Sequence, residues 1–320
     1  MLAKGLNIDM KITIPRRVGV PETSLWVEVM TEDGETTSLG KKRNVMLLAP
    51  GGPGGNHTVY DEIKDELFKY ADLILFDPRG CGYSDPSDVD YCTIDHYRDD
   101  IDAIREYFGL EKIILFGGSY GSMASLGYAV KYQDRLEKLI LSGGAPSFRF
   151  IDLAKQNLKM RGTEEQITVG EKLFSGGFKT SFEFEEFYKI MAPLYVYKHQ
   201  PQDAVPTTKS KIPYNVDVTN RGFSDFLTKF NYEPLLRNIN CDTLVLFGKN
   251  DWINDPSLAE LMANNIPNSK LVLLDECGHF IWRDQKEKFF AALQDFLLPC
   301  LKENTLSSKS FEERQYMCKL

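Results

Sequence analysis

Short apolar runs recur along the chain, and between several of them apolar residues return every three or four positions. The first pattern predicts β-strands and the second predicts amphipathic helices. Continuous apolar runs are typical of strands buried on both faces of a parallel sheet, so the alternation predicts an α/β fold. The runs cover residues 44–49, 72–76, 112–116, 138–141, 243–247 and 270–274. Two further segments near the start of the chain, 10–14 and 25–30, predict a hairpin-like entry to the same sheet.

The clearest helix is predicted from Ile94 to Phe108, where apolar residues mark one face and Gly109 supplies a C-terminal cap. A second helix is predicted to begin near Tyr120, directly after a strand, and a last one to cover residues 286–297.

The rhythm changes between Ala145 and Leu235, where no apolar run resembles a buried strand. Amphipathic stretches there, with breaks at Gly176–Gly177, Pro193 and Pro206, predict a helical insertion between two strands of one sheet. Its many aromatic residues can wall a pocket or pack a small core of the insertion, and both readings stay open. We therefore expect three parts: a core of residues 1–146 and 236–300, a helical cap of residues 147–235, and a polar C-terminal tail of residues 301–320.

Composition narrows the class of protein. The 320 residues are 42% hydrophobic and 26% charged, as in globular proteins, and no run of eighteen apolar residues predicts a membrane span. The formal net charge of −8 argues against a nucleic-acid partner, so we expect neither nucleic acid nor membrane as a partner. The first residues lack the apolar block of a signal peptide, and six scattered cysteines fit neither a disulfide framework nor a zinc site. We expect a cytoplasmic protein with reduced thiols, no metal and no cofactor, and the sequence predicts no oligomeric state.

The strongest chemical signal is Gly117-Gly118-Ser119-Tyr120-Gly121, which matches the G-x-S-x-G pattern. A predicted buried strand enters it and a helix of small residues leaves it, which is the context that this motif requires. Serine on such a sharp turn takes strained backbone angles, and small neighbours leave its hydroxyl free. We predict Ser119 as a nucleophile; the alternative is a glycine-rich turn without chemistry.

A serine nucleophile needs a neighbouring base. Of four histidines, His279 follows the predicted strand 270–274 and lies where parallel sheets place catalytic groups. We predict His279 as the general base. The weaker candidates are His57, which follows the glycine-rich loop, His96, which lies in the first turn of a helix, and His199, which lies in the insertion.

The base in turn needs an orienting acid. Asp251 follows the predicted strand 243–247 and is the first choice, with Asp255 and Asp275 as alternatives. The chain order is then serine, aspartate, histidine.

Acyl transfer also needs N–H donors for a developing oxyanion. The backbone N–H of Tyr120 is one predicted donor, and the glycine-rich loop 49–55 offers the other, with Gly52 preferred to Gly51. A phosphate site is disfavoured, because the loop has neither a Gly-Lys-Ser/Thr ending nor the G-x-G-x-x-G spacing.

Together these motifs resemble the proline iminopeptidase (prolyl aminopeptidase) family of α/β-hydrolases. The resemblance implies an eight-stranded, mostly parallel sheet flanked by helices, with a helical cap inserted after the sixth strand. It further implies cleavage of an N-terminal residue, often proline, from a small peptide or amino-acid derivative. Asp77 and Arg79 would then be structural residues of the turn beside the nucleophile. The motifs are GGPGG at 51–55, DPRGCGYS at 77–84, GGSYG at 117–121, GKND at 248–251 and CGH at 277–279.

Two departures from the family affect the expected site. The family usually has histidine before the paired glycines, and this chain has Pro50, so the loop is expected to be held differently. The family also binds the substrate amine with cap glutamates, and the comparable stretch 215–223 has none. The carboxylates that could replace them are Asp217, Glu233 and Glu185, with Glu183 and Glu186 as further candidates.

Without such a carboxylate, an uncharged ester or amide is the better substrate, because a charged amine in a dry pocket needs a paired charge. An esterase or amidase is therefore the first alternative function, and a non-catalytic binding module on a hydrolase scaffold is the second. Cys277 lies two residues before the predicted base and is read as a small buried residue, with a place in the site as the alternative.

Overall fold

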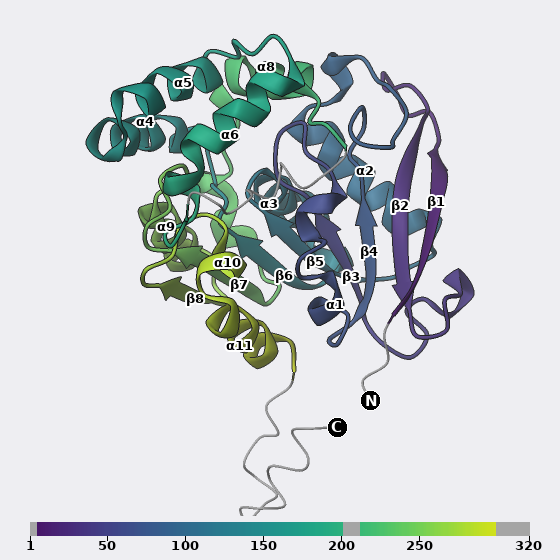
Figure 1. The fold of residues 1–320 in the computed structure, drawn as a ribbon. Helices are drawn as coiled ribbons and strands as arrows, with labels where there is room; N and C mark the ends of the chain where they lie inside the picture. Colours follow the sequence, from purple (N-terminus) through teal and green to yellow (C-terminus); the bar gives the residue numbers. More distant parts are fainter. Residues whose placement is uncertain (1–4, 201–211, 299–320) are drawn as a thin grey trace, which may run out of the picture.

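An eight-stranded sheet crosses the molecule in the computed structural model, which describes residues 5–200 and 212–298 (Figure 1). Its strand order is β1-β2-β4-β3-β5-β6-β7-β8. β1 and β2 form an antiparallel pair, β2 is antiparallel to β4, and the remaining neighbours are parallel. The strands are β1 (Leu6–Ile14), β2 (Thr23–Thr31), β3 (Val45–Ala49), β4 (Asp72–Phe76), β5 (Ile113–Gly118), β6 (Leu136–Ser142), β7 (Thr243–Gly248) and β8 (Ser269–Leu274).

All eight predicted strands occur, and the hairpin-like entry is confirmed by the β1–β2 pairing. The main difference is at the start, where β1 begins at Leu6 rather than at residue 10. Its first residues are largely exposed, so they carry little apolar signal, and cross-strand pairing such as Leu6 with Thr31 extends the strand instead.

Helices follow most strands, as expected from the spacing of apolar residues. The prediction for 286–297 is confirmed by α11, and the helix predicted from Ile94 ends at Tyr107, with Gly109 in the left-handed region just beyond it. The helices are α1 (Lys64–Leu67), α2 (Ile94–Tyr107), α3 (Tyr120–Tyr132), α4 (Phe150–Arg161), α5 (Glu164–Phe174), α6 (Ser181–Tyr195), α8 (Val216–Ser224), α9 (Pro256–Asn265), α10 (Ile281–Asp284) and α11 (Lys286–Leu297), with a 3₁₀ turn η2 at His57–Tyr60.

The predicted helical insertion follows the sixth strand. The helices α4, α5, α6 and α8 lie between β6 and β7 in the chain and gather together on one side of the sheet in Figure 1. Gly176, with a φ of 62°, separates α5 from α6 as predicted. The break predicted at Pro193 is wrong, because α6 continues to Tyr195. A proline this close to the end of a helix removes one backbone hydrogen bond, and few helical residues follow it.

Some boundaries of the predicted parts remain predictions. Pro206 and the tail 301–320 lie outside the described residues. The predicted boundaries between core and cap, at 146/147 and 235/236, stay predictions.

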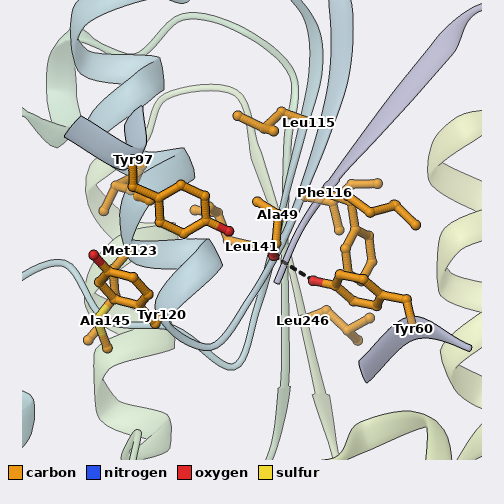
Figure 2. Close-up of a cluster of buried hydrophobic side chains, with 14 of the residues drawn as sticks. Ala49, Tyr60, Tyr97, Leu115, Phe116, Tyr120, Met123, Leu141, Ala145 and Leu246 are labelled. Carbon is orange, nitrogen blue, oxygen red and sulfur yellow. Dashed lines mark hydrogen bonds between the residues drawn. The ribbon is translucent and has the colours of Figure 1, made fainter. Parts of the chain in front are cut away.

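The central strands are buried on both faces. In Figure 2, Tyr97 and Tyr120 lie on one side of the strands, while Tyr60 and Phe116 lie on the other. One continuous cluster of buried apolar residues extends from these strands into the inserted helices, for example to Phe187 of α6. The insertion and the sheet thus share one hydrophobic core. This packing fixes the side chains of the insertion that face the carboxyl ends of the strands.

Candidate active site

Ser119 occupies the turn between β5 and α3. Its φ of 54° lies in the left-handed region, as predicted for a strained strand-to-helix turn. Its backbone N–H donates to the carbonyl of Ser142 at 2.8 Å, so the turn stays attached to β6. A Cβ added at Gly121 would lie 2.0 Å from the carbonyl oxygen of Ala49. Glycine at this position therefore allows the helix to approach the loop after β3.

Asp251 and His279 are hydrogen-bonded to each other. The Nδ1 atom of His279 lies 2.6 Å from Oδ2 of Asp251, and both side chains are buried. The other oxygen, Oδ1, accepts the backbone N–H groups of Ile253 and Asn254 at 3.0 Å each. Because these two donors hold Oδ1, the carboxylate presents Oδ2 to the imidazole in one fixed orientation.

The adjacent strands β7 and β8 bring this pair together, since Asp251 follows the former and His279 the latter. His279 and Ser119 both line one cavity at the carboxyl ends of the strands. The described residues that complete its lining come from the core and the insertion: Gly51, Gly52, Val59, Tyr60, Gly118, Ser142, Leu173, Phe184, Phe187, Tyr188, Tyr195, Tyr214, Thr219, Phe223, Ile253, Phe280 and Trp282.

The end of α6 supports the loop that carries His279. The carbonyl of Tyr195 accepts the backbone N–H of His279 at 2.8 Å. Asp284 accepts the N–H of Gly278 at 2.8 Å and those of Tyr197 and Lys198 at 2.9 and 3.0 Å. The contacts of Tyr195, Tyr197 and Lys198 were not predictable from the sequence, because each joins residues more than eighty positions apart. The hydrogen bond from Gly278 to Asp284 depends on the path of the loop.

The other histidines lie outside the cavity. His57 is buried, its Nδ1 is 2.7 Å from Oδ1 of Asp77, and its ring lies 4.0 Å from that of Trp26. His96 interacts with the hydroxyl of Thr93, and burial is the main reason that its pKa is lowered. His199 does not line the cavity either.

The residues of the DPRGCGYS motif hold a buried turn. Asp77 is fully buried and accepts the backbone N–H groups of His57 and Tyr83 at 2.9 and 2.7 Å. Arg79 makes two hydrogen bonds, at 3.0 and 2.9 Å, to the carboxylate of buried Asp100. These contacts are structural, as the family resemblance implied.

The alternative acids lie away from the imidazole. Asp255 caps α9 by accepting the N–H of Ser257 at 3.0 Å. Asp275 is exposed and pairs with Lys249 at 2.8 Å. Among the three candidate acids, the structure brings only Asp251 to His279.

None of the carboxylates predicted to bind an amine lines the cavity. Asp217 is exposed in the first turn of α8, where the positive end of the helix favours a negative charge. Glu233 accepts the hydroxyl of Ser147 and pairs with Arg149 at 3.2 Å. Glu185 is partly exposed on α6; its neighbours Glu183 and Glu186 pair with lysines.

The glycine-rich loop lies against the serine. Gly51 and Gly52 both line the cavity, and a Cβ added at Gly51 would come within 3.1 Å of the Cβ of Ser119. Gly52 has a φ of 146°, which side chains rarely permit. The backbone of Tyr120 begins α3 directly beside this loop, so the predicted N–H donors belong to neighbouring segments.

Cys277 is fully buried and does not line the cavity. Burial, with smaller contributions from Asp284 and Asp251, raises the pKa of its thiol. The reading as a small buried residue fits this position.

Within the described parts of the chain, no group of three or more His, Cys, Asp or Glu side chains is arranged to hold a metal ion. No helix there is long and apolar enough to span a bilayer.

Comparison with known proteins identifies similar chains. A family model described as alpha/beta hydrolase fold matches residues 44–282. A proline iminopeptidase of Pestalotiopsis fici is 32% identical over 244 residues, which cover 74% of this chain and 85% of that protein. A proline iminopeptidase of Saccharolobus solfataricus is 28% identical over 268 residues, with coverage of 81% and 86%. The crystal structure of a proline iminopeptidase from Mycobacterium smegmatis matches the fold with a TM-score of 0.67 at 20% identity, covering 90% of this chain and 97% of that one.

Proposed function

Because the chain belongs to the proline iminopeptidase family of α/β-hydrolases and is a hydrolase, we propose that it removes an N-terminal residue, proline first among the candidates, from small peptides through an acyl-enzyme. The observation that carries the proposal is the 2.6 Å contact of His279 with Asp251 at the wall of the cavity that Ser119 also lines.

Ser119 is the proposed nucleophile. Its hydroxyl attacks the scissile carbonyl while Nε2 of His279 accepts the hydroxyl proton. The C–N bond then breaks, the same proton passes to the leaving amine, and the N-terminal residue remains on the serine as an ester. Water, deprotonated by His279, attacks this ester and releases the amino acid with Ser119 restored.

Asp251 is the proposed orienting acid. With Oδ1 occupied by two backbone N–H groups, Oδ2 accepts the Nδ1 proton of His279. This contact leaves Nε2 without a proton, as a base requires, and stabilises the imidazolium that forms during attack.

The N–H groups of Gly52 and Tyr120 are the proposed oxyanion donors, with Gly51 as the alternative to Gly52. Gly52 lines the cavity, and Tyr120 directly follows Ser119 at the start of α3. Such fixed dipoles stabilise the negative charge that develops on the carbonyl oxygen during attack.

The cavity lining supports a second candidate, an esterase or amidase of uncharged substrates. Apart from His279, the described residues that line the cavity carry no ionisable acid or base other than tyrosine. A charged amine placed against aromatic and aliphatic side chains loses hydration without gaining a carboxylate.

The first experiment separates the mechanism from its alternatives. Ser119→Ala is expected to lower kcat by at least ~10³-fold with an unchanged thermal unfolding midpoint, since only the nucleophile is lost. A fluorophosphonate should add its mass to Ser119 in the parent chain. Ser175→Ala, which changes an exposed serine, is the matched control. Substantial turnover by Ser119→Ala contradicts the mechanism, and failure of the parent chain to be labelled favours a non-catalytic binding module.

The second experiment compares three substrates of the parent chain: prolyl p-nitroanilide, its N-acetylated form, and p-nitrophenyl acetate. A higher kcat/KM for the free prolyl compound supports the aminopeptidase. A preference for the acetylated compound or the ester supports the second candidate.

A further inference from the structure

Two buried tyrosine hydroxyls hold the loop that follows β3. The hydroxyl of Tyr60 donates to the carbonyl of Ala49 at 2.6 Å, and the hydroxyl of Tyr97 donates to the carbonyl of Pro50 at 2.9 Å. Tyr60 belongs to η2 and Tyr97 to α2. Figure 2 places their rings on opposite sides of Ala49. Two successive carbonyls, directly before Gly51, are therefore fixed from two different elements.

Both hydroxyls are permanent donors. Tyr60 is fully buried and Tyr97 is 4% exposed. Burial is the main cause that raises the pKa of each hydroxyl well above its ordinary value, so neither loses its proton where the enzyme is folded. Ring packing also restricts Tyr97, whose ring lies 5.6 Å from that of Phe76 and 5.4 Å from that of Tyr120.

The peptide bond transmits this restraint to the cavity. A peptide unit is planar, so fixing the carbonyl of Pro50 also fixes the direction of the Gly51 N–H. The nucleophile turn also limits the loop, because a Cβ at Gly121 would approach the oxygens of Ala49 and Pro50 to 2.0 and 2.7 Å. The Tyr97 hydroxyl and the start of α3 both restrain the loop, and Gly51 lies directly against Ser119.

We propose that Tyr97, assisted by Tyr60, is a positioning residue that holds the loop from which Gly52, or alternatively Gly51, offers its N–H group to the oxyanion. This inference rests on the proposed function, because it presumes attack by Ser119. The inference also explains how the loop is held in this chain, which has Pro50 where the family usually has histidine. The Tyr97 hydroxyl of α2 donates a hydrogen bond to the backbone carbonyl of Pro50.

The test is Tyr97→Phe, which removes only the hydroxyl. We measure kcat and KM with whichever of prolyl p-nitroanilide and p-nitrophenyl acetate the parent chain hydrolyses, and the inhibition constant of phenylboronic acid, which forms a tetrahedral adduct with serine. We expect kcat to fall about 10- to 100-fold, since losing a whole oxyanion donor costs ~10²–10³ and misplacement costs part of that. KM should change by less than about twofold, because the contact matters in the transition state. The inhibition constant of the boronate should rise in parallel with the loss of kcat.

Tyr128→Phe is the matched control. Its hydroxyl is also buried and donates to Asp102 at 3.0 Å, but the residue does not line the cavity. This variant should keep its kcat and its boronate affinity. A Tyr97→Phe enzyme with kcat within about twofold of the parent refutes the inference, and so does an equal loss in Tyr128→Phe.

If Tyr97→Phe does not fold, Tyr60→Phe decides the question at the Ala49 carbonyl, and an unchanged kcat there overturns the inference. Failure of the proposed function has a different signature: the parent chain hydrolyses neither substrate and takes up no fluorophosphonate.

Discussion

Replacing Asp251 by asparagine tests most directly whether this carboxylate orients the imidazole of His279. The side chain keeps its shape, and its carbonyl oxygen can still accept the N–H groups of Ile253 and Asn254. The amide NH₂ then faces Nδ1 of His279, where a carboxylate oxygen lay 2.6 Å away. An amide donates, so Nδ1 must become the acceptor and the imidazole proton moves to Nε2. A protonated Nε2 cannot take the proton of the Ser119 hydroxyl.

The expected cost follows from that change of tautomer. An asparagine in this role lowers kcat by roughly 10⁴-fold, which is about 5 kcal/mol of transition-state stabilisation. The fold should lose only about 1–3 kcal/mol, because one hydrogen bond to a charged group is replaced and the backbone contacts remain. Activity and stability therefore separate in this variant.

The assay measures kcat, the rate of fluorophosphonate labelling and the thermal unfolding midpoint of Asp251→Asn. The control is Asp275→Asn, whose exposed carboxylate pairs with Lys249 at 2.8 Å and which should behave like the parent chain. If Asp251→Asn keeps more than about one tenth of the parent kcat, Asp251 is not the orienting acid and the reasoning from the 2.6 Å contact is refuted.

Three further predictions concern other residues. Iodoacetamide at pH 8 should leave the native enzyme active and Cys277 unlabelled, because the thiol is buried and burial raises its pKa. Mass spectrometry should find the label on Cys277 only after unfolding, and a labelled Cys277 in the active enzyme would contradict this. Burial raises the pKa of Asp102, but hydrogen bonds from Arg105 and Arg135 outweigh burial and lower it, so the carboxylate stabilises the fold above its unfolded pKa and loses this contribution as the pH falls through the folded pKa. The difference in unfolding midpoint between the parent and Asp102→Asn should therefore be largest near pH 7 and shrink below about pH 4; a difference that does not vary with pH would refute this linkage. Gly121→Ala should lower the free energy of unfolding, measured by urea titration, by about 3 kcal/mol or more, because the new Cβ would lie 2.0 Å from the carbonyl oxygen of Ala49. An unchanged free energy of unfolding would show that the loop after β3 moves away from the Cβ at little cost.

Local signals in the sequence were sufficient to locate the eight strands, apart from the start of β1. The run 72–76 matches β4 at both ends because every residue of that strand is buried, so apolar character and strand length coincide. The strained backbone of Ser119 was predictable for a similar reason, since the motif of small residues that signals it lies within two positions of the serine.

Contacts between distant segments were beyond such reasoning. The periodicity of α2 places Tyr97 on its buried face, but nothing in the sequence tells that its hydroxyl meets the carbonyl of Pro50, 47 residues earlier. The cap carboxylates illustrate the same limit. Its place in a stretch comparable to the family's makes Asp217 a candidate. In the structure it lies exposed at the start of α8, where the positive end of the helix favours its charge.

Because the His279 loop is attached to the end of α6, the inserted helices cannot be exchanged without affecting that loop. A chimaera that received its inserted helices from another hydrolase would exchange more than the walls of its cavity, since the Tyr195 carbonyl and the amides of Tyr197 and Lys198 would leave with them. The walls of the cavity and the placement of His279 would thereby be inherited together. Grafts that retain residues 195–198 should stay active where wider exchanges fail, and natural changes in this turn should be accompanied by changes at Asp284.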